Sequence, residues 1–183
     1  MRKLNIAIIG LGNIGSYLFN YLKTNKKILT EKNNCIPVIK YVSAKKRKKR
    51  NIKFNKGQWL DNYLLATKLK DVDLVVELIG GAEGPAKKLV FSALKNKKHV
   101  VTANKALIAK YGDRLSKIAE KNKVNLEFEA SVCGGVPIIR SLKEGLIANK
   151  ISKIYGIFNG TSNYILSSMD QENKSFNEVL HNA

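Results

Sequence analysis

Apolar and polar positions alternate in blocks along the first two thirds of the chain, and each short apolar run is followed by a stretch with helical spacing. Short continuous apolar runs are typical of strands buried on both faces of a parallel sheet. We predict strands at residues 4–9, 37–43, 73–79, 99–102 and 124–129. We predict helices at residues 14–22, 60–69, 85–94 and 105–121. This alternation predicts an α/β fold, a Rossmann-type doubly wound parallel sheet with right-handed crossovers.

Other segments depart from this alternation. Residues 23–34 are polar, and residues 45–58 are basic and polar and are expected to form a surface loop. After about residue 136 the pattern changes, which suggests the beginning of a second, α+β domain. There we predict, in order, a helix, a strand, the start of another helix and a polar end at residues 137–147, 151–158, 159–163 and 173–183.

A glycine-rich turn joins the first predicted strand to the first predicted helix. It fits G-x-G-x-x-G in the strand–turn–helix context that this pattern requires, and it consists of Gly10, Leu11, Gly12, Asn13, Ile14 and Gly15. The first glycine permits the tight turn, the second lets a pyrophosphate approach the backbone, and the third allows close helix–strand packing. The helix N-terminus then offers unpaired N–H groups to phosphates. The alternative is a glycine turn that serves packing alone.

The end of the second predicted strand bears on which nicotinamide cofactor is bound. A site for NAD usually has Asp or Glu there, whereas this chain has Ser43-Ala44-Lys45 and no acidic residue until Asp61. Lysine and arginine would attract a 2′-phosphate. We therefore predict NADP(H), with Lys45 as the leading phosphate contact and Arg47 as a second. A solvated basic loop and use of NAD(H) are the alternatives.

The formal net charge of +19 results from 33 Lys and Arg against 14 Asp and Glu. Such a charge favours phosphate-bearing ligands and nonspecific contact with nucleic acid. Lysine is scattered over most segments, however, and only residues 45–50 concentrate it, so no specific nucleic-acid partner is predicted. Two cysteines, no apolar run of about 18 residues and no signal peptide predict a cytoplasmic protein with no membrane partner.

Four ordered blocks together resemble homoserine dehydrogenases over essentially the whole chain. They are Glu77–Gly81, His99–Leu107, Phe128–Ile139 and Gly156–Leu166. The resemblance implies reversible hydride transfer between L-homoserine and L-aspartate 4-semialdehyde, in threonine and methionine biosynthesis, by an enzyme that is a homodimer at full length. It also implies an NADP-binding Rossmann domain at residues 1–135 and the beginning of a substrate and dimerisation domain at residues 136–183.

The resemblance also implies roles for particular residues. It places Lys105 near the nicotinamide and the substrate, where an ammonium group could polarise the aldehyde oxygen or help to protonate the developing alkoxide. We assign Gly80 and Thr102 to the cofactor site as well. Gly160 and Thr161 are the preferred polar contacts to the substrate, although helix capping is an alternative role for Thr161.

A further segment resembles the family's loop for a monovalent cation. The match places a carboxylate at Glu129 and main-chain carbonyl oxygens at Val132, Gly134 and Val136. Oxygen ligands from a tight, glycine-containing backbone suit a hard cation such as Na⁺ or K⁺. The alternative is a glycine-rich domain junction in which Glu129 pairs with a nearby lysine.

Members of the family continue past the position of Ala183 with an acidic substrate-binding segment and a second lysine. We therefore expect this chain to be a fragment that binds NADPH and turns over homoserine poorly or not at all. Two other functions stay open: a related amino-acid dehydrogenase, and an NADP-binding or nucleic-acid-binding module without catalysis. The Thr102–Lys105 and Asn159–Asn163 blocks favour the homoserine dehydrogenase interpretation.

Overall fold

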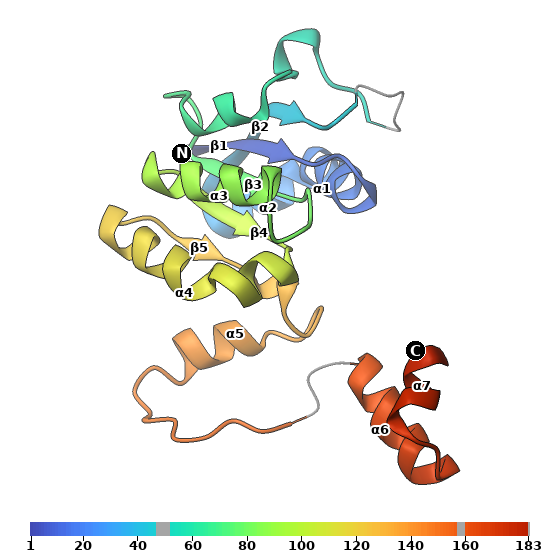
Figure 1. The fold of residues 1–183 in the computed structure, drawn as a ribbon. Coiled ribbons are helices and arrows are strands. Elements are labelled where there is room, and N and C mark those ends of the chain that lie inside the picture. The colour runs from blue at the N-terminus through green and yellow to red at the C-terminus, as the bar shows by residue number, and fades with distance from the viewer. Residues whose placement is uncertain (47–51, 157–159, 183) are drawn as a thin grey trace. The chain divides into compact units, whose positions relative to one another are not determined.

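The computed structural model describes residues 1–46, 52–156 and 160–182 (Figure 1). The chain divides into two compact units, Met1–Val132 and Cys133–Ala183. The division falls a few residues before the boundary predicted at residue 135. Each unit has its own secondary structure and is described by itself.

Unit 1 is built on a parallel five-stranded sheet with the order β2-β1-β3-β4-β5. The strands are β1 (Arg2–Ile9), β2 (Cys35–Ser43), β3 (Leu74–Glu77), β4 (His99–Thr102) and β5 (Leu126–Glu127). Ile9 lies opposite both Ser43 and Glu77, and Glu77 lies opposite Thr102. The carboxyl ends of four strands therefore meet at one edge of the sheet, and the predicted doubly wound α/β fold is confirmed.

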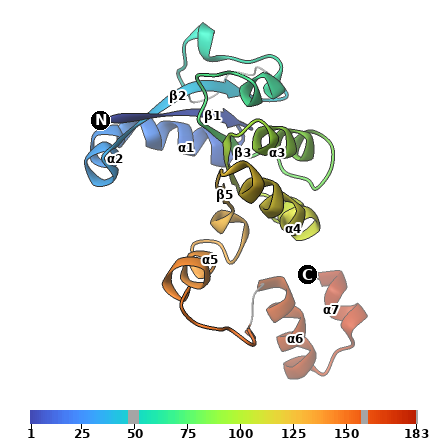
Figure 2. The ribbon, with the colours of Figure 1, turned by 90° about the vertical axis from the view of Figure 1, so that its left-hand side faces the viewer.

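Helices cover both faces of this sheet (Figure 2). They are α1 (Asn13–Thr24), α2 (Lys26–Asn33), α3 (Pro85–Lys95) and α4 (Lys105–Asn122). The first two lie on one face and the last two on the other. Short 3₁₀ turns occupy Lys56–Gln58, Tyr63–Thr67 and Glu129–Ser131.

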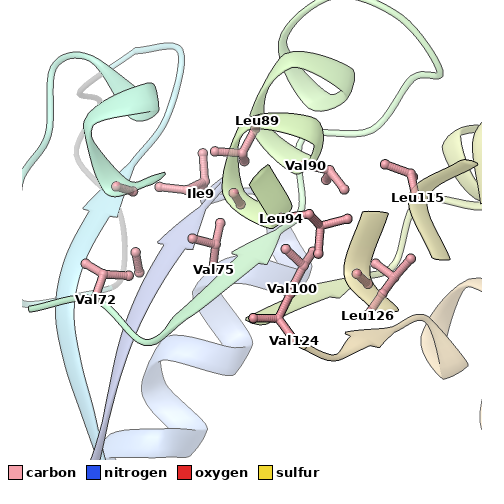
Figure 3. Packing of buried hydrophobic residues seen from close by; sticks show 14 of the residues in the cluster. Ile9, Val72, Val75, Leu89, Val90, Leu94, Val100, Leu115, Val124 and Leu126 are labelled. Atoms are coloured by element: carbon pink, nitrogen blue, oxygen red, sulfur yellow. The ribbon is translucent and has the colours of Figure 1, made fainter. Parts of the chain in front are cut away.

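The side chains of β1 alternate between two hydrophobic clusters, because successive residues of a strand point to opposite faces. Ile6 and Ile8 join a cluster with Phe19 of α1, whereas Ala7 and Ile9 join a cluster with α3 and α4. Figure 3 shows the second cluster, to which α3 contributes Leu89, Val90 and Leu94, α4 contributes Leu115, and the strands contribute Ile9, Val75, Val100 and Leu126. A strand buried on both sides has no polar face, which explains the continuous apolar runs of the sequence.

Two polar segments contain structure that the hydrophobic pattern does not reveal. Residues 23–34 include α2, which has no buried residue and ends at Asn34 in the left-handed conformation. In the predicted surface loop 45–58, Ile52 is buried and the ring of Phe54 lies 5.8 Å from that of Trp59. The loop is therefore partly anchored to the face that carries α1.

The last elements of unit 1 are shorter than predicted. The strand predicted at 124–129 forms hydrogen-bonded pairs with β4 only at Leu126 and Glu127, after which the chain turns. The helix predicted at 60–69 is a single 3₁₀ stretch from Tyr63 to Thr67. Thr67, in this stretch, is buried, and its hydroxyl group forms a hydrogen bond with that of Ser92 in α3.

Unit 2 is helical in the residues that the structure describes. It contains α5 (Ile138–Arg140), a π-helical continuation at Ser141–Gly145, α6 (Gly160–Glu172) and α7 (Phe176–Asn182). Ile165, Ser168 and Val179 are buried between the last two helices, so the polar end of the sequence does contain a core element.

The strand predicted at 151–158 is wrong over residues 151–156, which have no regular secondary structure. Ile151, Ile154 and Tyr155 are exposed there. A strand is stabilised by hydrogen bonds to a neighbouring strand, and no strand of the described residues pairs with this segment. The apolar residues of this segment are therefore insufficient to predict a strand.

Candidate functional site

The topology places a candidate site at the carboxyl edge of the sheet in unit 1. From β1 the chain crosses to β2 on one side, and it returns to β3 on the other side of β1. In an open α/β sheet, such a change of direction leaves a crevice outside the strand ends where ligands bind. The loops after β1 and β3 border this crevice.

The glycine-rich turn after β1 is closely packed at two positions and open at the third. A Cβ atom on Gly10, whose φ is +106°, would lie 2.3 Å from the carbonyl oxygen of Leu78. A Cβ atom on Gly15 would lie 1.9 Å from the carbonyl oxygen of Gly10, whereas one on Gly12 would meet no atom within 4 Å. The turn can therefore offer its open backbone at Gly12 to a bulky ligand.

The open glycine is also the N-cap of α1. It has no side chain to cap the helix, and no acidic residue lies in the first turn. Gly12, Asn13 and Ile14 are exposed, and Leu11 is buried in the cluster behind the turn. The positive end of the helix dipole and its N–H groups are thus available to an anion such as a pyrophosphate.

The end of β2 lies directly beside this turn. The main-chain N–H of Gly10 donates to the carbonyl oxygen of Ser43 at 2.9 Å. Lys45 follows two residues later and is exposed. This arrangement places a cation next to the turn, as a contact to a 2′-phosphate would require. Arg47, the second predicted phosphate contact, lies outside the described residues.

A buried carboxylate connects the ends of β3 and β4. Glu77 has no exposed surface, and its Oε1 accepts hydrogen bonds from the N–H groups of Ile79 at 2.7 Å and Gly80 at 3.1 Å. Its Oε2 accepts the hydroxyl proton of Thr102 at 2.5 Å. The side chain of Thr102 is itself fully buried, so a cofactor contact at this predicted position would involve the main chain.

Asn104 positions the beginning of α4. Its side-chain oxygen accepts the N–H of Leu107 at 3.1 Å, which caps the helix, and its Nδ2 donates to the carbonyl oxygen of Gly81 at 2.8 Å. Lys105 is the first residue of the helix and is exposed. Its amine forms no hydrogen bond or ion pair with the residues that the structure describes.

Lys105 and the glycine turn share the same edge of the sheet. The helices α1 and α4 lie on opposite faces, but both begin where their preceding strands end, at the carboxyl edge. The structure therefore brings the glycine turn, Lys45, Gly80 and Lys105 to the ends of four adjacent strands.

An exposed ionic cluster links the loop after β3 to α3 and α4. The carboxylate of Glu83 accepts hydrogen bonds from Lys110 at 2.8 Å, from the hydroxyl group of Tyr111, and from Lys87 at 3.0 Å. These three donors, with Lys110 contributing most, lower the pKa of Glu83 from its ordinary value of 4.5 to about 2. The cluster favours a fixed position of the loop relative to α4.

The remaining predicted site residues fall at or beyond the end of unit 1. Glu129 and Val132 belong to unit 1, whereas Gly134 and Val136 belong to unit 2, so the predicted cation ligands come from both units. Gly160 and Thr161 begin α6 and line a shallow hollow of unit 2 together with Tyr164 and Asn182.

Sequence reasoning missed the supporting residues around the site. Glu77 and Asn104 lie in blocks that carry the family resemblance, but no role was assigned to either. The available signals were an acidic residue at the end of an apolar strand and an Asn before an apolar helix, which is a capping signal. The partners of Glu83 are distant in sequence, and no local pattern connects Lys110 and Tyr111 with it.

Two features are absent from the described residues, a cluster of metal-binding side chains and a helix that could span a membrane. No group of three or more His, Cys, Asp or Glu side chains in that part of the chain is arranged to hold a metal ion. No helix within it is long and apolar enough to cross a membrane.

Comparison with known families places this geometry in context. The family model described as "Homoserine dehydrogenase, NAD binding domain" matches residues 10–129. A second model, described as "Homoserine dehydrogenase", matches residues 137–183. The first match covers the glycine turn and Lys105 together.

Individual relatives agree with these matches. The chain is 42% identical to a homoserine dehydrogenase of Neisseria gonorrhoeae and 40% identical to one of Bacillus subtilis, in both cases over 100% of the chain and 42% of the relative. A crystal structure of a homoserine dehydrogenase from Thiobacillus denitrificans superposes with a TM-score of 0.82 at 39% identity, covering 100% of this chain and 42% of that one. The chain thus spans about two fifths of the length of these relatives.

Substitutions at Gly15 and Gly12 test which glycine of the turn is closely packed and which is open. Gly15→Ala is expected to destabilise unit 1 by several kcal/mol, on the order of the cost of overpacking, because its Cβ would overlap the backbone of Gly10. Gly12→Ala should change the free energy of unfolding by less than about 1 kcal/mol, because nothing lies within 4 Å of the added atom. Urea denaturation followed by the fluorescence of the single tryptophan, Trp59, measures both. Equal losses for the two variants would contradict the described turn.

The lowered pKa of Glu83 predicts that the stability of the fold depends on pH. Its folded-state pKa of about 2 lies below its ordinary value of 4.5, so the ionised carboxylate stabilises the fold above pH 4.5, and this contribution is lost as the pH falls toward 2. Glu83→Gln should therefore lower the melting temperature at pH 6, and the difference from the parent should shrink steadily below pH 4.5. Glu31→Gln, on an exposed face of α2, is the control. A difference that is constant from pH 6 to pH 3 would exclude the ionic role of Glu83.

Proposed function

The chain belongs to the homoserine dehydrogenase family, and on this premise we propose that its first unit binds NADP(H) for the interconversion of L-homoserine and L-aspartate 4-semialdehyde. The observation that carries the proposal is the common edge of the sheet. The open backbone at Gly12 and the amine-bearing residue Lys105 follow the carboxyl ends of β1 and β4, the two strands on either side of β3. A dinucleotide that spans this edge would have its phosphates at the glycine turn and its nicotinamide toward Lys105.

The residues at this edge fit a dinucleotide. A Cβ atom at Gly12 would project into space free of protein atoms, and the capless N-terminus of α1 supplies N–H groups beside it. Lys45 follows β2 by two residues, close to the strand end at which this fold binds the adenosine ribose of a dinucleotide, and no acidic residue lies between Ser43 and Asp61. These features support NADP(H), with NAD(H) as the alternative.

When bound, the nicotinamide accepts or donates a hydride. In the oxidation of homoserine, the carbon that bears the hydroxyl group loses a hydride and the oxygen loses a proton, which gives the aldehyde. Lys105 in its amine form can accept that proton, and in the reverse reaction its ammonium form can donate a hydrogen bond and then a proton to the aldehyde oxygen. Its place at the first turn of α4, fixed by Asn104, would keep the amine at the strand ends.

Other parts of the proposal concern the second unit and the complete enzyme. We assign Gly160 and Thr161 to polar contacts with the substrate, and Glu129, Val132, Gly134 and Val136 to a structural site for Na⁺ or K⁺. Membership of the family supports these assignments, as well as a homodimeric enzyme in the biosynthesis of threonine and methionine.

The choice of cofactor can be tested at Lys45. Titration of the chain with NADPH, followed by nicotinamide fluorescence, should show saturable binding, and Lys45→Ala should weaken it about tenfold, the effect of losing one charge-assisted contact. Binding of NADH, which lacks the 2′-phosphate, should change less than about twofold, since an exposed lysine adds little to it. Lys121→Ala, at the end of α4, removes the same charge far from the predicted phosphate. Equal losses for NADPH and NADH, or for the two lysine variants, would refute the assigned contact.

The catalytic role can be tested in any form of the protein that turns over homoserine. Lys105→Ala should lower kcat by about 10²- to 10⁴-fold, the usual contribution of a proton-transfer group, with little change in the Kd for NADPH. Homoserine-dependent formation of NADPH, measured at 340 nm, gives kcat. Lys121→Ala, near the other end of the same helix and outside the Glu83 cluster, serves as the matched control. Retention of kcat by Lys105→Ala would remove Lys105 from the mechanism.

A further inference from the structure

We propose that Glu77 is a positioning residue: its buried carboxylate closes a ring of hydrogen bonds that holds Lys105 in register with the glycine turn. The inference rests on the proposed function, because it concerns the place of Lys105 beside the nicotinamide. It is carried by five hydrogen bonds that involve the side chains of Glu77, Thr102 and Asn104, and by the absence of any exposed surface on Glu77.

The first half of the ring folds the loop after β3 back over its own strand. The N–H groups of Ile79 and Gly80, two and three residues after the end of the strand, both donate to Oε1 of Glu77. The loop then continues through Gly80 and Gly81, with φ of +84° and +79°. Two successive residues in the left-handed region favour glycine strongly, so the sequence Glu77-x-x-Gly80-Gly81 is suited to this turn.

The second half of the ring returns from this loop to the same carboxylate. The carbonyl oxygen of Gly81 accepts from Nδ2 of Asn104 at 2.8 Å, and the main-chain N–H of Asn104 donates to the hydroxyl oxygen of Thr102 at 3.1 Å. The hydroxyl proton of Thr102 then goes to Oε2 of Glu77. Glu77, Thr102 and Asn104 are buried, so an unpaired donor or acceptor on these three residues would be costly.

The ring is joined to the glycine turn by the backbone of Leu78. Its N–H donates to the carbonyl oxygen of Ile9 at 2.8 Å, and its carbonyl oxygen occupies the space that a Cβ on Gly10 would need. A continuous series of contacts therefore runs from Gly10 through Glu77 and Asn104 to Lys105. A change in the ring should move the amine relative to the cofactor without removing any atom that touches the cofactor.

The hydrogen bond from Gly80 to Glu77 limits how Gly80 can contact a cofactor. Because its N–H group donates to Glu77, Gly80 cannot use that group for a phosphate. A cofactor contact at this exposed glycine would involve its Cα or its carbonyl oxygen.

Thr102→Val is the test variant, because it keeps the shape of the buried side chain and removes the hydroxyl link to Glu77. Thr102→Ser restores that link. Thr67→Val is the matched control, since Thr67 is equally buried and its hydroxyl group bonds elsewhere, to Leu64 and Ser92. Three quantities are measured for each: the Kd for NADPH, the protection of Lys105 from an amine-acylating reagent at saturating NADPH, and hydrogen exchange at Ile79 and Gly80.

We expect Thr102→Val to reduce the protection of Lys105 about fivefold and to accelerate exchange at Ile79 and Gly80, with a much smaller change in Kd, since one hydrogen bond is lost remote from the phosphates. Thr102→Ser should restore both quantities, and Thr67→Val should leave both unchanged. A Thr102→Val protein that melts earlier but shows parental protection of Lys105 would mean a structural role only, which overturns the proposal.

Failure of the proposed function would give a different result. If the parent chain binds no NADPH, the dinucleotide site is refuted, and the exchange data alone decide on the ring. Slow exchange at Ile79 and Gly80 in the parent that becomes fast in Thr102→Val would support the ring. Fast exchange at these amides in the parent would overturn it.

Discussion

The parallel register of β1, β3 and β4 is the constraint on which the site depends. In this register Ile9, Glu77 and Thr102 lie opposite one another at the carboxyl ends of their strands. The loops and helices that follow these residues therefore begin at one edge of the sheet. Gly10 lies so close to the backbone of Leu78 that no Cβ atom would fit between them, and this contact holds the end of β1 against the end of β3. Burial of both sheet faces against helices stabilises the register, since a shift by one residue would exchange the two faces of each strand.

A buried carboxylate at this edge is the least expected feature of unit 1. Desolvation of a carboxylate is unfavourable unless donors compensate for it, and Glu77 receives three. Replacement by an apolar residue would leave those donors unpaired, so the carboxylate and its partners stabilise one another. The arrangement converts the ends of two strands, a loop and a helix N-terminus into a single hydrogen-bonded structure, which suits a site that must keep a lysine at a defined place.

Much of this architecture could be predicted from the sequence, because buried parallel strands and amphipathic helices have clear periodicities. The strand at residues 99–102 is an example. The glycine turn could also be predicted, because its G-x-G-x-x-G spacing is visible in the local sequence. The helix α2 could not be predicted in this way, since it buries no residue and so has no apolar stripe. The strand predicted over residues 151–156 was wrong for a different reason: the segment has apolar residues, but no strand of the described residues pairs with it. The ring around Glu77 depends on residues brought together by the fold, and only the capping signal of Asn104 was local.

The account's central claim is that one ligand spans the strand ends from the glycine turn to the beginning of α4. Amide chemical shifts of the ¹⁵N-labelled chain, followed during titration with NADPH, test it most directly. The account predicts that the amides of Gly12 and Lys105 shift together and saturate at one common Kd, whereas that of Lys121 at the far end of α4 does not move. Shifts limited to scattered surface lysines, or different saturation at Gly12 and Lys105, would contradict it.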